Sequence, residues 1–391
     1  STHCISSAAS DVYKRQDTFG PIPYVNYGSS SLYDALDLVY NKFFEELDNA
    51  IEVLSNYVNG NVDAKLMSDY DCVYGGDVEK WVKFANTLRL RLAIRVSYAN
   101  PTLAEAQAKK SMENMFGFIE SKAERAELSH NSLEYHHPLH EIAYNFNSGD
   151  CRPGATIVAY LNGLNDSRIS SYFTTAGDGE YHGVRIGITT SNMSNYQGNK
   201  ISNLNINRAS TPVVWMTAAE SFFLRAEGAL RGWTMGGTAK SFYEQGVRMS
   251  FEENNAAGVD DYLADNTSTP GAFADNVGSD NYTFSSKVTP AWDDNADFEG
   301  QLERIITQKW IAIYPDGPEG WSEYRRTGYP EVIPVVRNSS NGTIDTELQV
   351  RRLPYTRDEK INNASGVASG ISALGGQDTG GTKLWWDKRS R

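Results

Sequence analysis

Cysteine is scarce in this chain, and the arrangement of the few cysteines argues against two kinds of cross-link. Only Cys4, Cys72 and Cys151 occur, so the number is odd, and no Cys-x-x-Cys pair is present. A disulfide framework uses an even set of cysteines, and a structural zinc site uses closely spaced ligand pairs. We therefore predict neither a disulfide framework nor a zinc site.

Long apolar runs and basic runs are also missing. No apolar run approaches the ~18 residues that a membrane-spanning helix needs. The sequence does not begin with the basic segment and apolar stretch of a signal peptide, and no apolar segment precedes Cys4, so we do not interpret Cys4 as a lipid anchor. Lys and Arg number 36 against 49 Asp and Glu, a net charge of −13. This acidic balance without a basic run indicates no nucleic-acid partner.

Recognisable catalytic motifs are not found either. The sequence has no Gly-x-Ser-x-Gly, no His-Glu-x-x-His, no P-loop and no Gly-x-Gly-x-x-Gly fingerprint. A glycosidase would need two carboxylates at a fixed separation, and nothing singles out such a pair among the 49 acidic residues. We therefore predict a protein that is not an enzyme and that has no cofactor.

Two patterns invite a metal site without fulfilling its requirements. His136 and His140 are four residues apart, but Pro138 lies between them and interrupts a helix. The order Asp293-x-Asn295-x-Asp297 suggests calcium, but Phe298 stands where the calcium loop needs glycine. A loop with surface histidines and a capped helix start are the preferred interpretations, so no metal site is predicted.

Apolar residues recur at helical spacing through most of the chain. The predicted helices span residues 31–54, 77–98, 103–115, 154–164, 218–232, 238–254 and 302–313. The pair 218–232 and 238–254 looks like a degenerate tetratricopeptide repeat, and because one pair cannot bury its apolar face alone, the helices near 32–54 and 77–98 should stack on it. We predict a mainly α fold: a single large domain with a tetratricopeptide-like scaffold of helical pairs and long irregular loop insertions.

The predicted placement of several charged and aromatic side chains follows from the same helices. Arg89, Arg91 and Arg95 should snorkel or pair with acidic helices rather than bind phosphate. Arg325 and Arg326 should be exposed and available to pair. One of the adjacent tryptophans 385 and 386 should dock into the core, because neighbours cannot face the same side. Residues 362–382 are rich in Gly, Ser, Asn and Ala, which predicts an irregular tail.

The two loop insertions, residues 176–208 and 258–291, are the predicted functional segments, since long loops commonly carry function. Aromatic rings offer flat faces to sugars, and amides and hydroxyls match sugar hydroxyl groups. A plain packing or disordered loop, and a packing role for the tryptophan, are the alternatives. The candidate ligand-binding residues are Tyr181, Asn192, Asn195, Tyr196 and Trp292.

Five stretches in order carry a family resemblance. They are DTFGPIPY (17–24), WVKFANTLRLRLAIRVS (81–97), AAESFFLRAEGALRGW (218–233), QKWIAIYPDGPEGWSEYRRTGYP (308–330) and the tail pair RRLPY (351–355) with LWWDK (384–388). Together they resemble the SusD/RagB family of nutrient-binding outer-membrane lipoproteins, from about residue 17 to the end. Residues 1–16 have no counterpart in it, so we interpret them as a non-native or artefactual leader before a SusD-like domain of residues 17–391.

The resemblance also implies a function, partners and a location. It implies non-catalytic capture of oligosaccharide or polysaccharide nutrients and their delivery to a SusC-like TonB-dependent transporter. It places the protein in the cell outer membrane, facing outward, through a lipid anchor in an N-terminal part that this chain lacks. The alternative is a tetratricopeptide-type scaffold that binds peptide or protein, and a third possibility is the family fold with a peptide ligand. The two long insertions favour glycan capture, because a pure scaffold has little need for them.

Overall fold

The computed structural model of the protein describes residues 13–61, 63, 65–128, 137–146, 149 and 151–389. Most of the predicted leader, and both His130 and His136, lie outside the described residues. The side chain of Asn192 also lies outside them, although its backbone is described.

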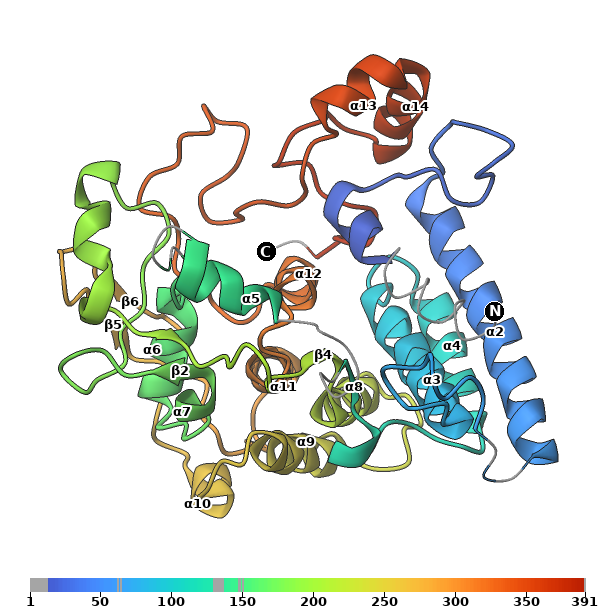
Figure 1. The fold of residues 1–391 in the computed structure, drawn as a ribbon, viewed down its shortest axis with the longest axis horizontal. Helices are drawn as coiled ribbons and strands as arrows, with labels where there is room; N and C mark the ends of the chain where they lie inside the picture. Colours follow the sequence, from blue (N-terminus) through green and yellow to red (C-terminus); the bar gives the residue numbers. More distant parts are fainter. Residues whose placement is uncertain are drawn as a thin grey trace.

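Paired helices form the body of the molecule (Figure 1). The first group is α2 (Leu36–Gly60), α3 (Val78–Arg95) and α4 (Pro101–Glu113), in which each helix packs on the next. The second group is α8 (Ala218–Leu230), α9 (Ala239–Glu253) and α11 (Phe298–Ala312). α8 packs on α9, α11 packs on both, and α3 joins the two groups by packing on α8. The stacking predicted for residues 77–98 is therefore confirmed by α3, whereas α2 packs on α3 rather than on the α8–α9 pair.

Short elements connect these helices and build the edges of the domain. Among the described residues, the strands form two-stranded antiparallel ribbons that pair β1 with β4, β2 with β3 and β5 with β6. The bounds are η1 (Lys122–Glu124), β1 (Ala126–Leu128), α5 (Pro138–His140), η3 (Glu141–Asn145), α6 (Ala155–Gly163), α7 (Ile169–Tyr172), β2 (Phe173–Thr174), η5 (Thr190–Tyr196), η6 (Gly198–Lys200), β3 (Asn203–Leu204), β4 (Val213–Met216), α10 (Val259–Ala264), β5 (Ala272–Phe273), β6 (Tyr282–Thr283), α12 (Gly317–Thr327), α13 (Arg357–Asn362) and α14 (Ala364–Leu374). The fold is therefore mainly helical, as predicted.

Helix starts follow the capping residues in the sequence. Asp77 and Thr217 accept backbone N–H groups at the starts of α3 and α8, and Asp297 does the same for α11. The acidic segment before residue 298 thus provides the predicted capped helix start. Helix α2 begins at Leu36, five residues after the predicted start at residue 31.

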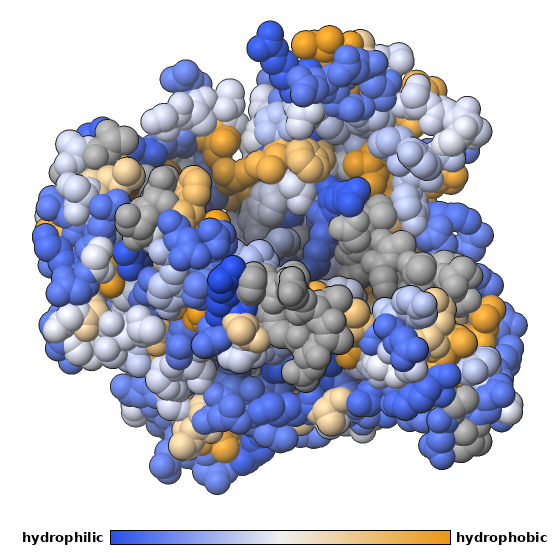
Figure 2. All heavy atoms as spheres, in the orientation of Figure 1, coloured by the Kyte–Doolittle hydropathy of each residue, from blue (hydrophilic) through white to orange (hydrophobic). Residues whose placement is uncertain are grey.

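The surface is mostly hydrophilic on the face shown in Figure 2, with apolar residues in small patches. Within the described part of the chain, no helix has both the length and the apolar character needed to cross a membrane.

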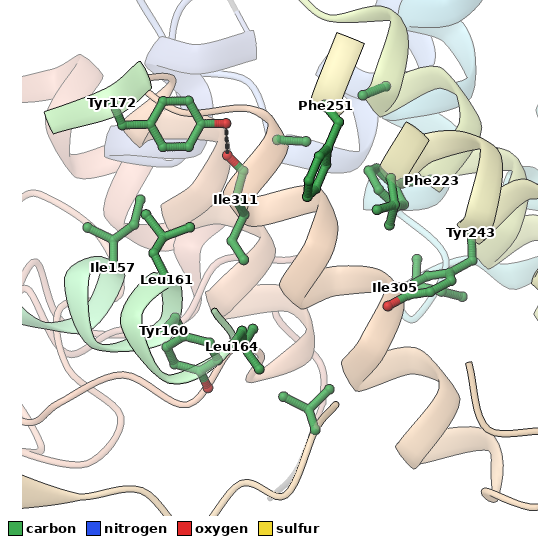
Figure 3. Packing of buried hydrophobic residues seen from close by; sticks show 14 of the residues in the cluster. Ile157, Tyr160, Leu161, Leu164, Tyr172, Phe223, Tyr243, Phe251, Ile305 and Ile311 are labelled. Carbon is green, nitrogen blue, oxygen red and sulfur yellow. Dashed lines mark hydrogen bonds between the residues drawn. The ribbon is translucent and has the colours of Figure 1, made fainter. Parts of the chain in front are cut away.

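The largest hydrophobic cluster fixes α6 and α7 against α11 (Figure 3). Ile157 and Leu161 of α6 lie opposite Ile311 of α11, and Tyr160 is completely buried beside them. The Tyr172 hydroxyl donates a hydrogen bond to the Ile311 carbonyl at 2.9 Å. Since residues 176–208 leave the core directly after α7, this packing gives the first insertion a rigid base.

A buried cluster of ion pairs joins α3, α11 and α12. Lys309 Nζ lies 3.5 Å from Glu319 Oε1 and 3.2 Å from Glu323 Oε2. Arg95 Nη2 donates to Glu319 Oε1 at 2.5 Å. All four side chains are buried, and a buried charge without a partner is strongly destabilising. Removing any one of these charged side chains would therefore leave a buried charge on a neighbouring helix without its partner.

The prediction that Arg325 and Arg326 are exposed is wrong. Arg326 is completely buried, with Nη2 2.7 Å from Glu227 and 2.6 Å from Glu323. Arg325 is also buried and donates to the Asp17 carbonyl at 2.6 Å. Their partners come from α8 and from the beginning of the domain, so only the tertiary fold reveals that these arginines can be buried.

The arginines of α3 pair with acidic residues, as predicted. Arg89 bonds to Asp48 of α2, and Arg91 Nε donates to Glu220 of α8 at 2.7 Å. Arg91 and Arg95 are fully buried rather than snorkelling to the surface. Their role is to link helices inside the core.

Both ends of the described chain meet in the core. Residues 13–19 are helical, and Tyr13 is buried, where its hydroxyl accepts a hydrogen bond from Arg91 at 2.7 Å. Residues 13–16 of the expected leader therefore pack as part of the domain. At the other end Trp386 is fully buried and donates to Asp17 at 2.8 Å, which confirms that one tryptophan of the pair anchors the tail.

Two further local predictions need correction. Residues 362–382, expected to be irregular, contain α14, which is capped by Asn363. His137 belongs to the segment around His136 and His140 that was predicted to be a loop with surface histidines, but it is 3% exposed, and its backbone N–H donates to the Arg208 carbonyl. In both places backbone caps and tertiary contacts outweigh the polar local composition.

Candidate functional site

The two predicted insertions, residues 176–208 and 258–291, lie beside each other at the left of Figure 1, beyond α6 and α7. The Asn276 side chain of the second donates to the Lys200 carbonyl of the first at 2.8 Å. Strand β5 of the second insertion packs on α6. The insertions therefore form one continuous surface on a helical base, and that surface is largely hydrophilic in Figure 2.

A hollow of about 370 Å³ opens between α6 and the second insertion. We call it the tyrosine hollow. Its lining includes Asn162, Glu180, Tyr181, His182, Pro270 and Phe273. Tyr181 is half-buried and packs against the hydrophobic core, and its carbonyl accepts a hydrogen bond from Asn162 at 3.1 Å. The hollow thus combines an aromatic ring and an apolar floor with polar groups at its rim, as ligand pockets commonly do.

Gly163 allows this hollow to form. A Cβ atom at this position would lie 2.4 Å from the Pro270 carbonyl oxygen, which is far inside van der Waals contact. Only glycine lets the second insertion approach the end of α6 this closely. The absence of a side chain at Gly163 is therefore what allows the second insertion to pack this closely on α6.

A second hollow of about 570 Å³ lies between the two insertions. We call it the asparagine hollow. It is lined by Gly177, Asp178, Asn195, Asn199, Lys200, Asn276 and Val277. Asn195 is exposed at its edge. Three amides, one amine and one carboxylate offer both donors and acceptors, which suits a ligand rich in hydroxyl groups.

A hydrogen bond between Asp178 and His182 joins the two hollows. The distance from His182 Nε2 to Asp178 Oδ2 is 2.8 Å. This hydrogen bond, together with the Glu180 backbone N–H, lowers the pKa of the Asp178 carboxyl. Asp178 lines the asparagine hollow and His182 lines the tyrosine hollow. The two hollows therefore lie on either side of one short turn and can act as two parts of one site.

Tyr196, predicted to contact ligand, is 4% exposed in the structure. Its hydroxyl donates to Asp275 Oδ2 at 2.6 Å and so fastens the first insertion to the second. Burial and the bond to Asp275 raise the pKa of Tyr196. Burial alone would raise the pKa of Asp275, but the bonds from Tyr196, Gly278 and Val277 lower it. In this structure Tyr196 holds the two insertions together, and its buried ring is not available to a ligand.

Trp292, the other predicted stacking residue, directly follows the second insertion and lies away from both hollows. Its ring is half-buried, 5.3 Å from the Tyr243 ring of α9, and its indole N–H donates to Asp294 at 3.0 Å. It does not line either hollow. The structure therefore brings Tyr181, Asn195 and Tyr196 into one region and leaves Trp292 outside it.

Sequence reasoning missed several residues of the hollows, among them Asn162, Asn199 and Asn276. Asn162 lies near the end of a predicted helix, where exposed asparagine is common. Asn276 follows Asp275, whose carboxylate accepts the backbone N–H groups of residues 277, 278 and 280. The Asp-x-x-Gly pattern of that turn was the one available signal, and it indicates a turn rather than a ligand contact.

Charge in the hollows is low and mixed, with Asp178 and Glu180 against Lys200. Among the residues that the structure describes, no group of three or more His, Cys, Asp or Glu side chains is placed to hold a metal ion. What the arrangement can do is hold a polar ligand against a tyrosine ring.

Solved structures resemble this chain closely over nearly all of its length. A chitin-binding SusD homologue from Flavobacterium johnsoniae shares 41% identity with a TM-score of 0.94, covering 100% of this chain and 81% of that one. A SusD homologue from Bacteroides uniformis shares 41% identity with a TM-score of 0.91, covering 99% and 81%. A SusD-like protein from Bacteroides thetaiotaomicron shares 39% identity at the same TM-score and coverage.

A search of the curated proteins gave no match. The SusD-like family, described as "Susd and RagB outer membrane lipoprotein", matches residues 8–387. The match spans almost the whole sequence and agrees with the structural neighbours. The chain therefore belongs to the SusD-like family of outer membrane lipoproteins.

Proposed function

We propose that this protein captures oligosaccharides at the cell surface without catalysis, and that the tyrosine and asparagine hollows bind them. The observation that carries the proposal is the pair of adjacent hollows on the two insertions, one with the half-buried Tyr181 and the other lined by Asn195, Asn199 and Asn276. A sugar ring would stack on Tyr181, and the amides would bond to its hydroxyl groups. The chitin-binding homologue at 41% identity supports a glycan ligand.

We also propose that the protein faces outward in the outer membrane and delivers the captured oligosaccharides to a SusC-like TonB-dependent transporter. The family of outer membrane lipoproteins supports the location. Affinity for one short glycan should be weak, because desolvation of sugar hydroxyl groups offsets much of the gain. Tethering at a membrane would then raise the apparent affinity for a long polymer through repeated binding.

The proposal is tested by affinity electrophoresis against a panel of soluble polysaccharides, followed by calorimetry with matching oligosaccharides. We expect one glycan class to retard the protein. Tyr181→Ala should weaken binding by about 1–2 kcal/mol, roughly 5- to 30-fold. Tyr70→Ala is the matched control, since Tyr70 is 81% exposed on the connection between α2 and α3.

Two results would contradict the proposal. One is a folded protein that no glycan retards, and the other is a Tyr181→Ala variant that binds as tightly as the parent. Capture of a peptide by the helical scaffold, the alternative function, would appear as partner binding that persists when the insertions are shortened.

A further inference from the structure

Acidic side chains stand at the junction of the two hollows. Asp178 lines the asparagine hollow and Glu180 lines the tyrosine hollow, both on the turn that separates them and both exposed. Lys200 lines the asparagine hollow together with Asp178. Among the described residues that line the tyrosine hollow, Glu180 has no lysine or arginine beside it.

Tyr181 and Glu180 are neighbours in the chain and line the same hollow. The face of an aromatic ring carries negative potential and attracts a cation. A nearby carboxylate attracts the same cation and repels an anion. A ligand ring that stacks on Tyr181 would therefore be bound more strongly if it carried an ammonium group and less strongly if it carried a carboxylate or sulfate.

The charge of the whole molecule acts in the same direction. The chain carries a net charge of −13, and a field of this sign lowers the local concentration of anionic ligands while raising that of cationic ones. The overall field and the local pair of side chains thus favour the same ligand charge, although only the local pair can distinguish positions on a glycan.

We propose that this site prefers amino sugars with a free amine to their N-acetylated counterparts, and rejects glycans built on uronic acids or carrying sulfate. The inference rests on the proposed glycan-binding function and specifies its ligand class. Glu180 is the proposed specificity-determining residue, because it is exposed and lines the same hollow as Tyr181. Asp178 contributes less, because it is hydrogen-bonded to His182 and shares the asparagine hollow with the cationic Lys200.

The test compares three oligosaccharides of equal length by calorimetry, at low salt and at a mildly acidic pH at which the sugar amine is protonated. They are β-1,4-linked glucosamine, β-1,4-linked N-acetylglucosamine and a β-1,4-linked uronate. We expect the free-amine ligand to bind about three- to ten-fold more tightly than the N-acetylated one, and the uronate most weakly. Glu180→Gln should reduce the ratio of the first two affinities by about two- to five-fold, the range of an exposed ion pair.

Two controls separate the local effect from general attraction to an acidic protein. Glu105→Gln makes the same charge change on an exposed residue of α4, and it should leave the ratio unchanged. Tyr181→Ala should weaken both ligands, whereas non-specific adsorption of the cationic ligand would survive it. Added salt should reduce the preference for the free amine, because exposed charges are screened.

Equal affinity for the free-amine and N-acetylated ligands would overturn the inference and leave glycan capture standing. A preference that Glu180→Gln does not change would also overturn it. Failure to bind any glycan would instead remove the proposed function and the inference together.

Discussion

Replacing Glu319 with glutamine should lower the free energy of unfolding by about 3 kcal/mol near neutral pH. Glu319 is 1% exposed, and its Oε1 accepts a hydrogen bond from Arg95 at 2.5 Å. Burial alone would raise its pKa, but Arg95, Arg91 and Lys309 outweigh burial and lower the pKa from 4.5 to about 2. A lowering of this size corresponds to about 3 kcal/mol in favour of the ionised carboxylate in the folded state. Breaking a buried ion pair typically costs about 3–5 kcal/mol, which agrees.

The pH dependence of this effect has a definite sign. The pKa of Glu319 is lower in the folded state, so its stabilisation is complete above the unfolded pKa and declines as the pH falls toward 2. The difference in stability between the parent and Glu319→Gln should therefore narrow by about 1 kcal/mol at pH ~4 and by about 2 kcal/mol at pH ~3.

Urea unfolding followed by circular dichroism, at several pH values from about 7 to about 3, measures this difference. Glu105→Gln serves as the control, because Glu105 is exposed on α4 and its loss should change stability by less than about 0.5 kcal/mol. The reasoning is refuted if Glu319→Gln is as stable as the parent at neutral pH, or if its destabilisation stays constant as the pH falls.

Two further substitutions test residues that the sequence assigned to the ligand. Trp292→Ala should lower the melting temperature because the ring packs on Tyr243, and a simultaneous loss of about 1–2 kcal/mol in glycan binding would assign its outer face to the ligand. Tyr196→Phe removes the hydrogen bond to Asp275 and should reduce stability by about 1 kcal/mol and weaken glycan binding through the loosened asparagine hollow. Unchanged binding by Tyr196→Phe, measured by calorimetry, would show that this hydrogen bond does not position the hollow.

Helical periodicity allowed most of the scaffold to be predicted from the sequence. The helices α3, α8, α9 and α11 each present a periodic apolar face and begin beside a capping residue, and both signals are local. The stacking of pairs followed from the need to bury those faces. Local signals therefore fix where helices form, within a few residues at each end.

Burial of charge could not be predicted in the same way. Arg325 and Arg326 lie on a short, charged segment, and a local pattern of that kind usually indicates an exposed face. Their partners, Asp17 and Glu227, are far away in the sequence. The free energy of burying these arginines thus depends on contacts that exist only after folding.

The candidate site, too, could be predicted from the sequence only in part. The composition of the insertions identified Tyr181 and Asn195, since aromatic and amide side chains suit a sugar wherever the loop places them. It could not identify Asn162, which belongs to α6 and borders the tyrosine hollow only because the second insertion packs on that helix. Nor could it distinguish the half-buried Tyr181 from the buried Tyr196.

A crystal structure with the bound oligosaccharide is the most direct test of the proposed site. The glycan to use is the one that retards the protein in affinity electrophoresis. The account predicts a sugar ring on the face of Tyr181, with hydroxyl groups bonded to amides of the asparagine hollow. A glycan bound only at Trp292, or anywhere else with both hollows empty, would contradict it.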